Sequence, residues 1–312
     1  MVMADVYVAG WEFNGTAIVA KYWKNGLPVT LGEGPNWTWT SSIAISDSDI
    51  YVAGHAFNWL VDVAEYWKNG NLVVLGDGVN GSQANAIVVA GSDVYVAGEQ
   101  GRDGLRNAVY WKNGQTITLP EGLVATSIAI NGNDIYVAGE KGIANISIAQ
   151  YWKNGQPVTL TDGTKDAHAT SIAVSGSDVY VAGYESNGSA YVAKYWKNGQ
   201  AIALTDGTKD AYSSSVVVAG KDVYVAVWGD FKKGDYETGK YWKNGQAVAF
   251  TNDPDLARGN CIAVLDNNVY VAGLEDDASG TQLKYWKNNQ STVLPTNNPQ
   301  AYINSMAVIE RK

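Results

Sequence analysis

The chain has 312 residues, a formal net charge of −9 at pH 7 and a pI near 4.7. An acidic chain repels the phosphates of nucleic acids and of anionic lipid headgroups, so we expect neither a nucleic-acid partner nor a membrane-surface role. No stretch approaches the length of a membrane-spanning helix, which argues against membrane insertion. The single cysteine, Cys261, excludes an intramolecular disulfide.

The pentapeptide Tyr-Trp-Lys-Asn-Gly recurs along the whole chain. Its seven copies begin at residues 22, 66, 110, 151, 195, 241 and 285, and the last copy ends in Asn289 in place of Gly. Successive tryptophans of these copies are separated by 44, 44, 41, 44, 46 and 44 residues. A fixed period in this range is typical of repeat architectures.

The copy at residues 178–221 shows what one repeat contains. It opens with Asp-Val-Tyr-Val-Ala-Gly, a β-branched and aromatic run that predicts a strand buried on both faces. A variable loop leads to a second strand at 191–196. Asn198-Gly199 then predicts a type I′ hairpin turn, because both central positions of that turn need φ > 0. With two further strands, at 200–204 and 214–218, the repeat matches the four-stranded blade of a β-propeller.

Seven such repeats predict one all-β domain over residues 1–312, a seven-bladed β-propeller with four antiparallel strands per blade. The repeats span 5–48, 49–92, 93–133, 134–177, 178–221, 222–267 and 268–312. The chain starts on the second strand of a blade, from residue 5, and ends on a first strand at 305–309. Pairing of these two strands closes the ring through a composite blade, which removes exposed sheet edges. We expect a monomer.

The two repeated motifs, Asp-Val-Tyr-Val-Ala-Gly and Tyr-Trp-Lys-Asn-Gly, resemble the blades of uncharacterised bacterial propeller proteins, many of them surface-exposed, over essentially the whole chain. The resemblance implies a propeller in a bacterial, extracytoplasmic setting and no active-site residues. The first residues show no signal-peptide pattern, so that setting requires a leader that was removed. The blade signatures of WD40 proteins and of sialidase-like propellers are missing, so the functions of those families are not transferred.

A propeller places its tight hairpin turns and its remaining loops at opposite ends of the strands, here called the bottom and the top face. The bottom turns barely vary between copies, whereas the top loops vary strongly, as expected of a loop-borne binding surface or of loops without a function. Seven of the twelve tryptophans belong to the pentapeptides and are expected in the core between blades. The other five fall in top-face segments.

Most of these spare aromatic residues lie near the first two blades, and two of them, Trp37 and Trp39, are expected in the connection at residues 32–40. Flat rings stack on sugars or on peptide side chains, and exposed aromatic clusters mark ligand sites. The alternative is that the rings pack on one another. The predicted ligand site consists of Trp11, Phe13, Trp37, Trp39, His55, Phe57 and Trp59.

A secondary candidate site is the irregular insert at 227–239, which carries Trp228, Phe231 and Tyr236 and has Val227 where the other copies have Gly. The aspartates that open the blades are expected to bond their own turns and to offset the lysines of the pentapeptides. No metal-binding or cofactor-binding pattern is present, so we expect neither a metal nor a cofactor.

Catalytic groups are scarce. The only histidines are His55 and His168, and His168 looks like an ordinary loop variant because the sister copy has Tyr212. Cys261 is expected to be a small buried residue. A glycosidase needs only a pair of carboxyl groups. Four acids lie near the expected channel mouth. Glu99 and Glu140 directly follow Val-Ala-Gly, and Glu12 and Glu185 come one residue later.

The sequence therefore favours a non-catalytic binding propeller whose top face, near blades 1 and 2, engages a glycan or a protein surface. Two alternatives stay open. One is a carboxylate-based glycoside hydrolase or lyase at the channel mouth. The other is a consensus-designed or recently amplified scaffold without a ligand, which the identity of residues 160–167 and 204–211 suggests.

Overall fold

The computed structural model describes residues 3–32, 36–102, 105–143, 145–229, 239–251, 256–277 and 280–311. In these ranges every regular element is a β-strand. The strands are β1 (Ala4–Phe13), β2 (Ile18–Lys24), β3 (Leu27–Thr30), β4 (Trp37–Ser46), β5 (Asp49–Phe57), β6 (Asp62–Lys68), β7 (Asn71–Val74), β8 (Gly81–Ala90), β9 (Asp93–Arg102), β10 (Leu105–Lys112), β11 (Gln115–Thr118), β12 (Val124–Asn131), β13 (Asp134–Ile143), β14 (Ile146–Lys153), β15 (Gln156–Thr159), β16 (Ala167–Ser175), β17 (Asp178–Ser186), β18 (Tyr191–Lys197), β19 (Gln200–Ala203), β20 (Ala211–Ala219), β21 (Asp222–Gly229), β22 (Lys240–Lys243), β23 (Gln246–Ala249), β24 (Leu256–Leu265), β25 (Asn268–Asp277), β26 (Gly280–Lys287), β27 (Gln290–Leu294) and β28 (Ala301–Glu310).

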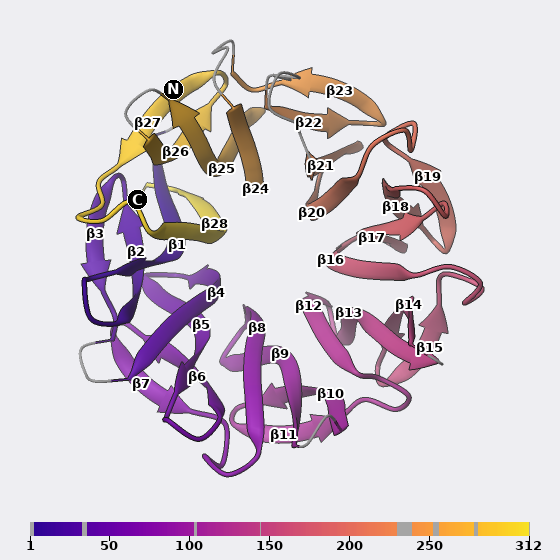
Figure 1. The fold of residues 1–312 in the computed structure, drawn as a ribbon, viewed down its shortest axis with the longest axis horizontal. Coiled ribbons are helices and arrows are strands. Elements are labelled where there is room, and N and C mark those ends of the chain that lie inside the picture. The colour runs from indigo at the N-terminus through magenta and orange to yellow at the C-terminus, as the bar shows by residue number, and fades with distance from the viewer. Residues whose placement is uncertain are drawn as a thin grey trace.

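The described residues form seven antiparallel sheets of four strands, arranged as blades around one axis (Figure 1). Blade 1 has the strand order β28-β1-β2-β3, and blades 2 to 7 take the other strands in groups of four, from β4–β7 to β24–β27. The first strand of each blade lies innermost in the ring (Figure 1). The predicted seven-bladed β-propeller is therefore confirmed.

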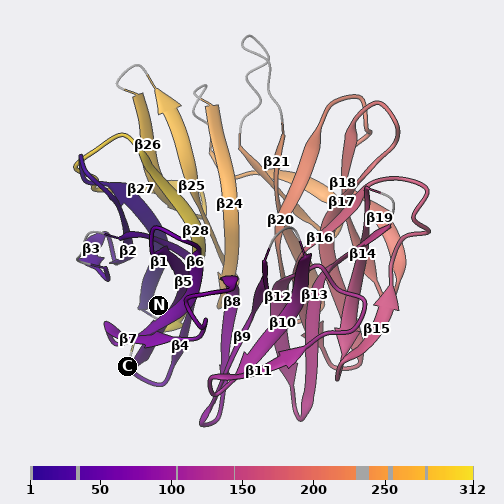
Figure 2. The ribbon, with the colours of Figure 1, turned by 60° about the horizontal axis from the view of Figure 1, so that its bottom comes forward.

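Blade 1 is the composite blade that closes the ring. β1 pairs with β28, and Asp5 lies opposite Ile309, as the predicted pairing with residues 305–309 requires. β28 starts earlier than predicted, because the pairing continues beyond a bulge until Glu12 lies opposite Ala301. Both chain ends lie in this blade, on the bottom face (Figure 2).

The bottom turns repeat one set of bonds, which blade 5 illustrates. Asn198 and Gly199 have φ of 51° and 83°, as a type I′ turn requires. Oδ1 of Asn198 accepts the N–H of Val179 at 2.9 Å, while Nδ2 donates to Asp178 at 2.8 Å. Contrary to expectation, Asp178 bonds this neighbouring turn, because its carboxylate can reach both Asn198 and Nζ of Lys197, which lies 2.8 Å away. Blades 1 to 4 and 6 repeat the Asp–Asn and Asp–Lys contacts, so the lysines are offset as predicted.

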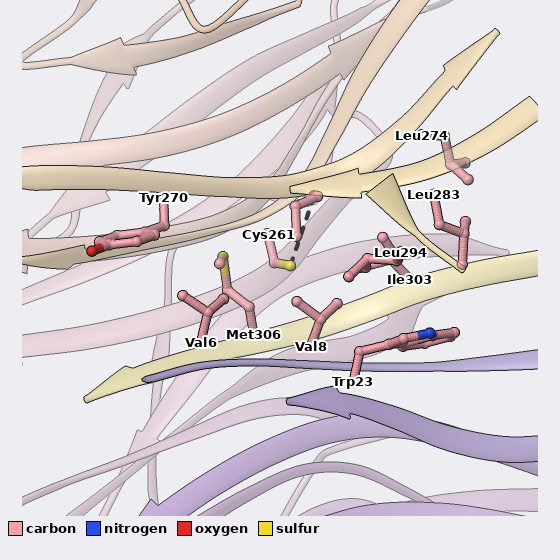
Figure 3. Packing of buried hydrophobic residues seen from close by; sticks show 11 residues of the cluster. Val6, Val8, Trp23, Cys261, Tyr270, Leu274, Leu283, Leu294, Ile303 and Met306 are labelled. Atoms are coloured by element: carbon pink, nitrogen blue, oxygen red, sulfur yellow. Dashed lines mark hydrogen bonds between the residues drawn. The ribbon is translucent and has the colours of Figure 1, made fainter. Parts of the chain in front are cut away.

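The core lies between the blades. Seven clusters of buried residues each join two neighbouring blades, as in the cluster of Figure 3, where Val8 and Trp23 of blade 1 meet Tyr270 and Leu283 of blade 7. Cys261 is buried in the same cluster, as predicted. The pentapeptide tryptophans also behave as predicted in six blades, since these are almost entirely buried: Trp23, Trp67, Trp111, Trp152, Trp196 and Trp286.

Each innermost strand carries a β-bulge near its top end. The bulged residues are polar, and several bond the next blade. The hydroxyl of Thr126 donates to the carbonyl oxygen of Ala169 at 2.7 Å, and that of Thr170 donates to Ser213 at 2.8 Å. These bonds join neighbouring blades around the axis.

Candidate functional site

Five of the seven predicted site residues meet in blade 2. Trp37 and Trp39 lie within β4, not in the connection before it, and pair across the sheet with Phe57 and His55 of β5. The rings of Trp39 and His55 stack with centroids 5.0 Å apart, while Trp37 meets Trp39 edge-on at 6.1 Å. Phe57 meets Trp59 edge-on at 6.1 Å. We call these five residues the blade-2 aromatic surface.

Trp59 occupies an unusual backbone conformation for a bulky residue. Its φ is +71°, in the left-handed region that favours glycine. Oδ1 of Asn58 accepts the N–H groups of Leu60 at 3.0 Å and Val61 at 2.8 Å, which fixes the turn. The corresponding turns of blades 1 and 5 have the same bonds to Asn14 and Asn187, but glycine follows each Asn: Gly15 with φ +99° and Gly188 with φ +97°.

The turn places apolar side chains in solvent. Trp59 is 66% exposed and Leu60 is 63% exposed, while Trp37 is 38% exposed. Val79 of the following blade connection is also exposed, and Nδ2 of Asn58 donates to the carbonyl of Gly78 at 3.1 Å, which ties this connection to the turn. Exposed apolar side chains gathered in this way mark interaction surfaces more often than isolated ones do.

His55 contributes a ring to this surface and no charge. Burial lowers the pKa of His55, although the carboxylate of Asp62 acts in the opposite direction. The imidazole is therefore neutral at neutral pH, which suits its stacking on Trp39.

The two predicted residues of blade 1 belong to a separate contact. Trp11 stacks on Tyr302 of β28, with ring centroids 6.0 Å apart and an interplanar angle of 21°. Phe13 ends β1, and its N–H donates to the carbonyl oxygen of Gln300. Sequence reasoning missed Tyr302 because its position opposite Trp11 depends on the register of the composite blade.

A second aromatic cluster, which sequence reasoning did not assemble, joins blades 5 and 6. Tyr212 stacks on Trp228 with centroids 4.5 Å apart and meets Tyr184 edge-on at 4.8 Å. Tyr184 in turn lies 5.3 Å from Tyr191 and 4.8 Å from His168. An alignment of the copies could have revealed it, because Tyr184 and Trp228 occupy the position of Trp11 and His55, directly after Val-Ala-Gly or its counterpart. Of the secondary candidates, Trp228 is described, whereas Phe231 and Tyr236 lie outside the described residues.

His168 is not a simple loop variant, because it lies in β16 between two acids. Its Nδ1 is 2.5 Å from Oε2 of Glu140, and its Nε2 is 3.0 Å from Oδ2 of Asp166. Burial by itself would lower the pKa of His168, but the hydrogen bonds and charges of Glu140 and Asp166 outweigh it and raise the pKa. Asp166 also accepts the hydroxyl of Tyr191 at 2.7 Å.

The acids of the hydrolase alternative all have cationic or imidazole partners. Glu12 lies 2.5 Å from Nζ of Lys21, Glu185 pairs with Lys194, and Glu99 lies 2.6 Å from Arg106. Glu140 is bound by His168, as described above. A cationic partner favours the charged form of a carboxyl group and so suits a structural carboxylate better than a general acid, which needs a proton at working pH.

Two acids have raised pKa values. Burial raises the pKa of Glu65 of β6 to about 7, and burial also raises the pKa of Glu99, where it outweighs the nearby Arg106. Glu65 occupies the place of Lys21 and Lys194 in the repeat. Within the described residues no group of three or more metal-binding side chains is found, and no helix is long and apolar enough to cross a membrane.

Comparisons with known proteins address the fold alone. No family model and no curated protein matches the sequence. Among solved structures, the chain is similar to the acylaminoacyl peptidase of Pyrococcus horikoshii, with 12% identity and a TM-score of 0.53 over 94% of this chain and 50% of the peptidase. A mutant sialidase of Trypanosoma rangeli is similar at 9% identity and a TM-score of 0.47, over 82% of this chain and 53% of the sialidase. The chain thus spans about half the length of these two proteins. At such identities the likeness describes the architecture and transfers no activity.

Proposed function

We propose that this protein is a non-catalytic binding propeller whose blade-2 aromatic surface, on the top face, engages a glycan or a protein surface. The observation that carries the proposal is Trp59, a bulky exposed side chain on a left-handed backbone where blades 1 and 5 have glycine. Local strain of this kind persists at functional sites because the strained residue has a task there.

The free-energy cost of the Trp59 backbone favours a ligand-binding role over a scaffold without a ligand. A left-handed backbone costs a non-glycine residue about 1–2 kcal/mol, and the exposed indole recovers little of this through burial in the free protein. A ligand that covers Trp59 and Trp37 recovers it through stacking and through removal of apolar surface from water. The hydrolase alternative has less support, because its four acids are bound by Lys, Arg or His side chains, although burial raises the pKa of Glu99.

The deciding experiment is W59G. Glycine relieves the backbone, so we expect a free energy of unfolding equal to the wild type or up to about 1 kcal/mol higher. The same change removes the most exposed ring, so the glycans that bind this surface are expected to be lost from the wild-type pattern on a glycan array. G188W is the matched control, because it puts Trp at the same turn position of blade 5 without the neighbours of blade 2 and is expected to lower stability and gain no binding.

Two outcomes would contradict parts of the proposal. If W59G binds the same glycans as the wild type, the blade-2 aromatic surface is not the site. If the folded wild type binds no glycan, the glycan half of the proposal is wrong. The protein-surface half is then tested by selecting displayed peptides on the wild type and measuring their affinity for W59G, and equal affinity for both forms rejects it.

A further inference from the structure

Blade 6 departs from the other blades at one residue of β21. Six blades have glycine after Val-Ala, and the structure shows why. A Cβ atom at Gly183 would lie 2.0 Å from the carbonyl oxygen of His168 and 2.9 Å from Cζ3 of Trp196. The glycine therefore lets the bulged inner strand and the pentapeptide Trp approach from two sides. In blade 6 this position is Val227, which is buried.

The valine coincides with an opening between two strands. In blade 5 the pairing of β17 with β18 runs through Gly183 as far as Ser186. Among the described residues of blade 6, the pairing of β21 with β22 ends where Ala226 lies opposite Tyr241, one residue before Val227. The side chain of Val227 takes the space that is free beside Gly183 in blade 5. For this reason β22 and Trp242 cannot pack against β21 as closely as β18 and Trp196 pack against β17. Trp242 is accordingly half-buried, whereas its five best-buried counterparts are at most 1% exposed.

A cavity of about 340 Å³ occupies this opening. Its apolar lining includes Val227, Trp228 and Trp242, and its polar lining includes Asp206, Thr208 and Asp210. The volume falls in the range of about 300–1,000 Å³ that is usual for small-molecule sites.

The polar side of the cavity is held in place by local bonds. The carboxylate of Asp206 accepts the N–H of Thr208 at 3.0 Å and its hydroxyl at 2.8 Å, and these bonds hold the pKa of Asp206 below its usual range. Asp210 accepts the N–H of Tyr191 at 2.7 Å. Lys209 and Lys240 also line the cavity, so two acids face two lysines. An uncharged ligand fits this balance, because it leaves no buried charge without compensation.

The apolar side offers a flat ring. Trp228 is 36% exposed and is supported from behind by its stacking on Tyr212. A sugar ring has an apolar C–H face, which packs on an aromatic ring, and hydroxyl groups, which donate hydrogen bonds to acceptors. The indole of Trp228 can take the first, and the carboxylates of Asp206 and Asp210 can take the second. We propose that blade 6 contains a pocket for one uncharged sugar unit, separate from the blade-2 aromatic surface and created by Val227.

The test compares three single substitutions. V227G gives blade 6 the glycine of the other blades, so we expect the β21–β22 ladder to extend and Trp242 to fill the cavity. Amide hydrogen exchange should slow at residues 227–229 and 239–241. The affinity for uncharged mono- and disaccharides, measured by calorimetry, should fall at least tenfold. W228A removes the ring without touching the ladder and should lose affinity to a similar degree, so the proposal stays testable even if V227G folds poorly.

The third substitution separates the two sites of the molecule. W59G removes the blade-2 aromatic surface alone and also serves as the background for V227G and W228A, so that the saccharide affinity measured there belongs to blade 6 and a failure of either proposal is distinguishable from a failure of the other. The proposal is overturned if no uncharged saccharide of the panel binds the wild type at millimolar concentration. It is equally overturned if, in the W59G background, binding survives both V227G and W228A.

Discussion

Blades 5 and 6 share the same connecting sequence and the same bottom turn, yet their pentapeptide tryptophans are buried to different degrees. Residues 160–167 and 204–211, which connect into these blades, are identical, and the bottom turns have matching φ values of 51° and 83° at 198–199 and 50° and 80° at 244–245. At the top, Trp196 is sealed in blade 5 and Trp242 is half-buried in blade 6. The comparison teaches that an intact pentapeptide does not by itself bury its Trp, and Val227, in place of glycine, is the difference next to Trp242.

The largest expected effect sharpens this contrast between the two tryptophans. W196A removes a ring that is 1% exposed from the core between blades 4 and 5 and should lower the free energy of unfolding by about 3–5 kcal/mol. W242A removes a half-buried ring beside an existing cavity, so its cost should be clearly smaller. Urea denaturation of both variants measures the difference. Equal losses would mean that Trp242 is as well packed as Trp196 and would contradict the comparison.

A second, smaller effect is expected when blade 5 receives the valine that blade 6 has after Val-Ala. G183V introduces a Cβ 2.0 Å from a backbone oxygen, and such overpacking typically costs about 1–3 kcal/mol. The thermal midpoint should fall, and amide exchange should accelerate at the top of β17 and β18. S189V, at an exposed residue of the top turn in the same blade, is the control and should change stability by less than about 0.5 kcal/mol. A G183V protein with wild-type stability would show that the glycine is dispensable.

The smallest effect concerns pH and uses the natural difference between His168 and Tyr212. Because the acids beside His168 raise its folded pKa above the ordinary value of 6.5, its protonation stabilises the folded state below pH 6.5. This stability is lost as the pH rises through the raised pKa. H168Y, which copies Tyr212, should lose that component. The difference in unfolding free energy between wild type and H168Y is measured by urea denaturation between about pH 5 and pH 9. It should shrink as the pH rises, and a constant difference would contradict the assignment.

Much of the fold could be read from local signals. The Asn-Gly turns were predictable because a left-handed backbone at two successive residues restricts the choice of side chain at those residues alone. The roles of Trp23 and of its five buried equivalents followed from their period, since a large apolar residue that recurs once per blade is expected in the core between blades, and Trp242 is the exception. The bonds of Asp178 were not predictable in the same way, because its partner, Asn198, belongs to the other bottom turn of the blade.

The candidate sites were predictable only in part. The count of spare tryptophans pointed to blade 2, and Val227 marked blade 6 as different. The cluster of Tyr184, Tyr191 and Tyr212 was not predicted, because tyrosine is common in every repeat and no single member of the cluster stands out in the sequence. Its rings meet only when two blades stand side by side with their bulges in register.

By itself, the sequence determined the strand pattern, the number of blades and the closure of the ring, since these follow from short-range backbone preferences and from a period that any stacking of the repeats must respect. Only the tertiary structure decided which side chains share a surface. The contact of Trp11 with Tyr302, the left-handed conformation of Trp59 and the cavity beside Val227 each depend on cross-strand register and on the spacing of neighbouring backbones. The contact of Trp11 with Tyr302 arises only when the ring closes, because residues at opposite ends of the chain then become neighbours, whereas the other two features arise when strands pair and neighbouring blades pack.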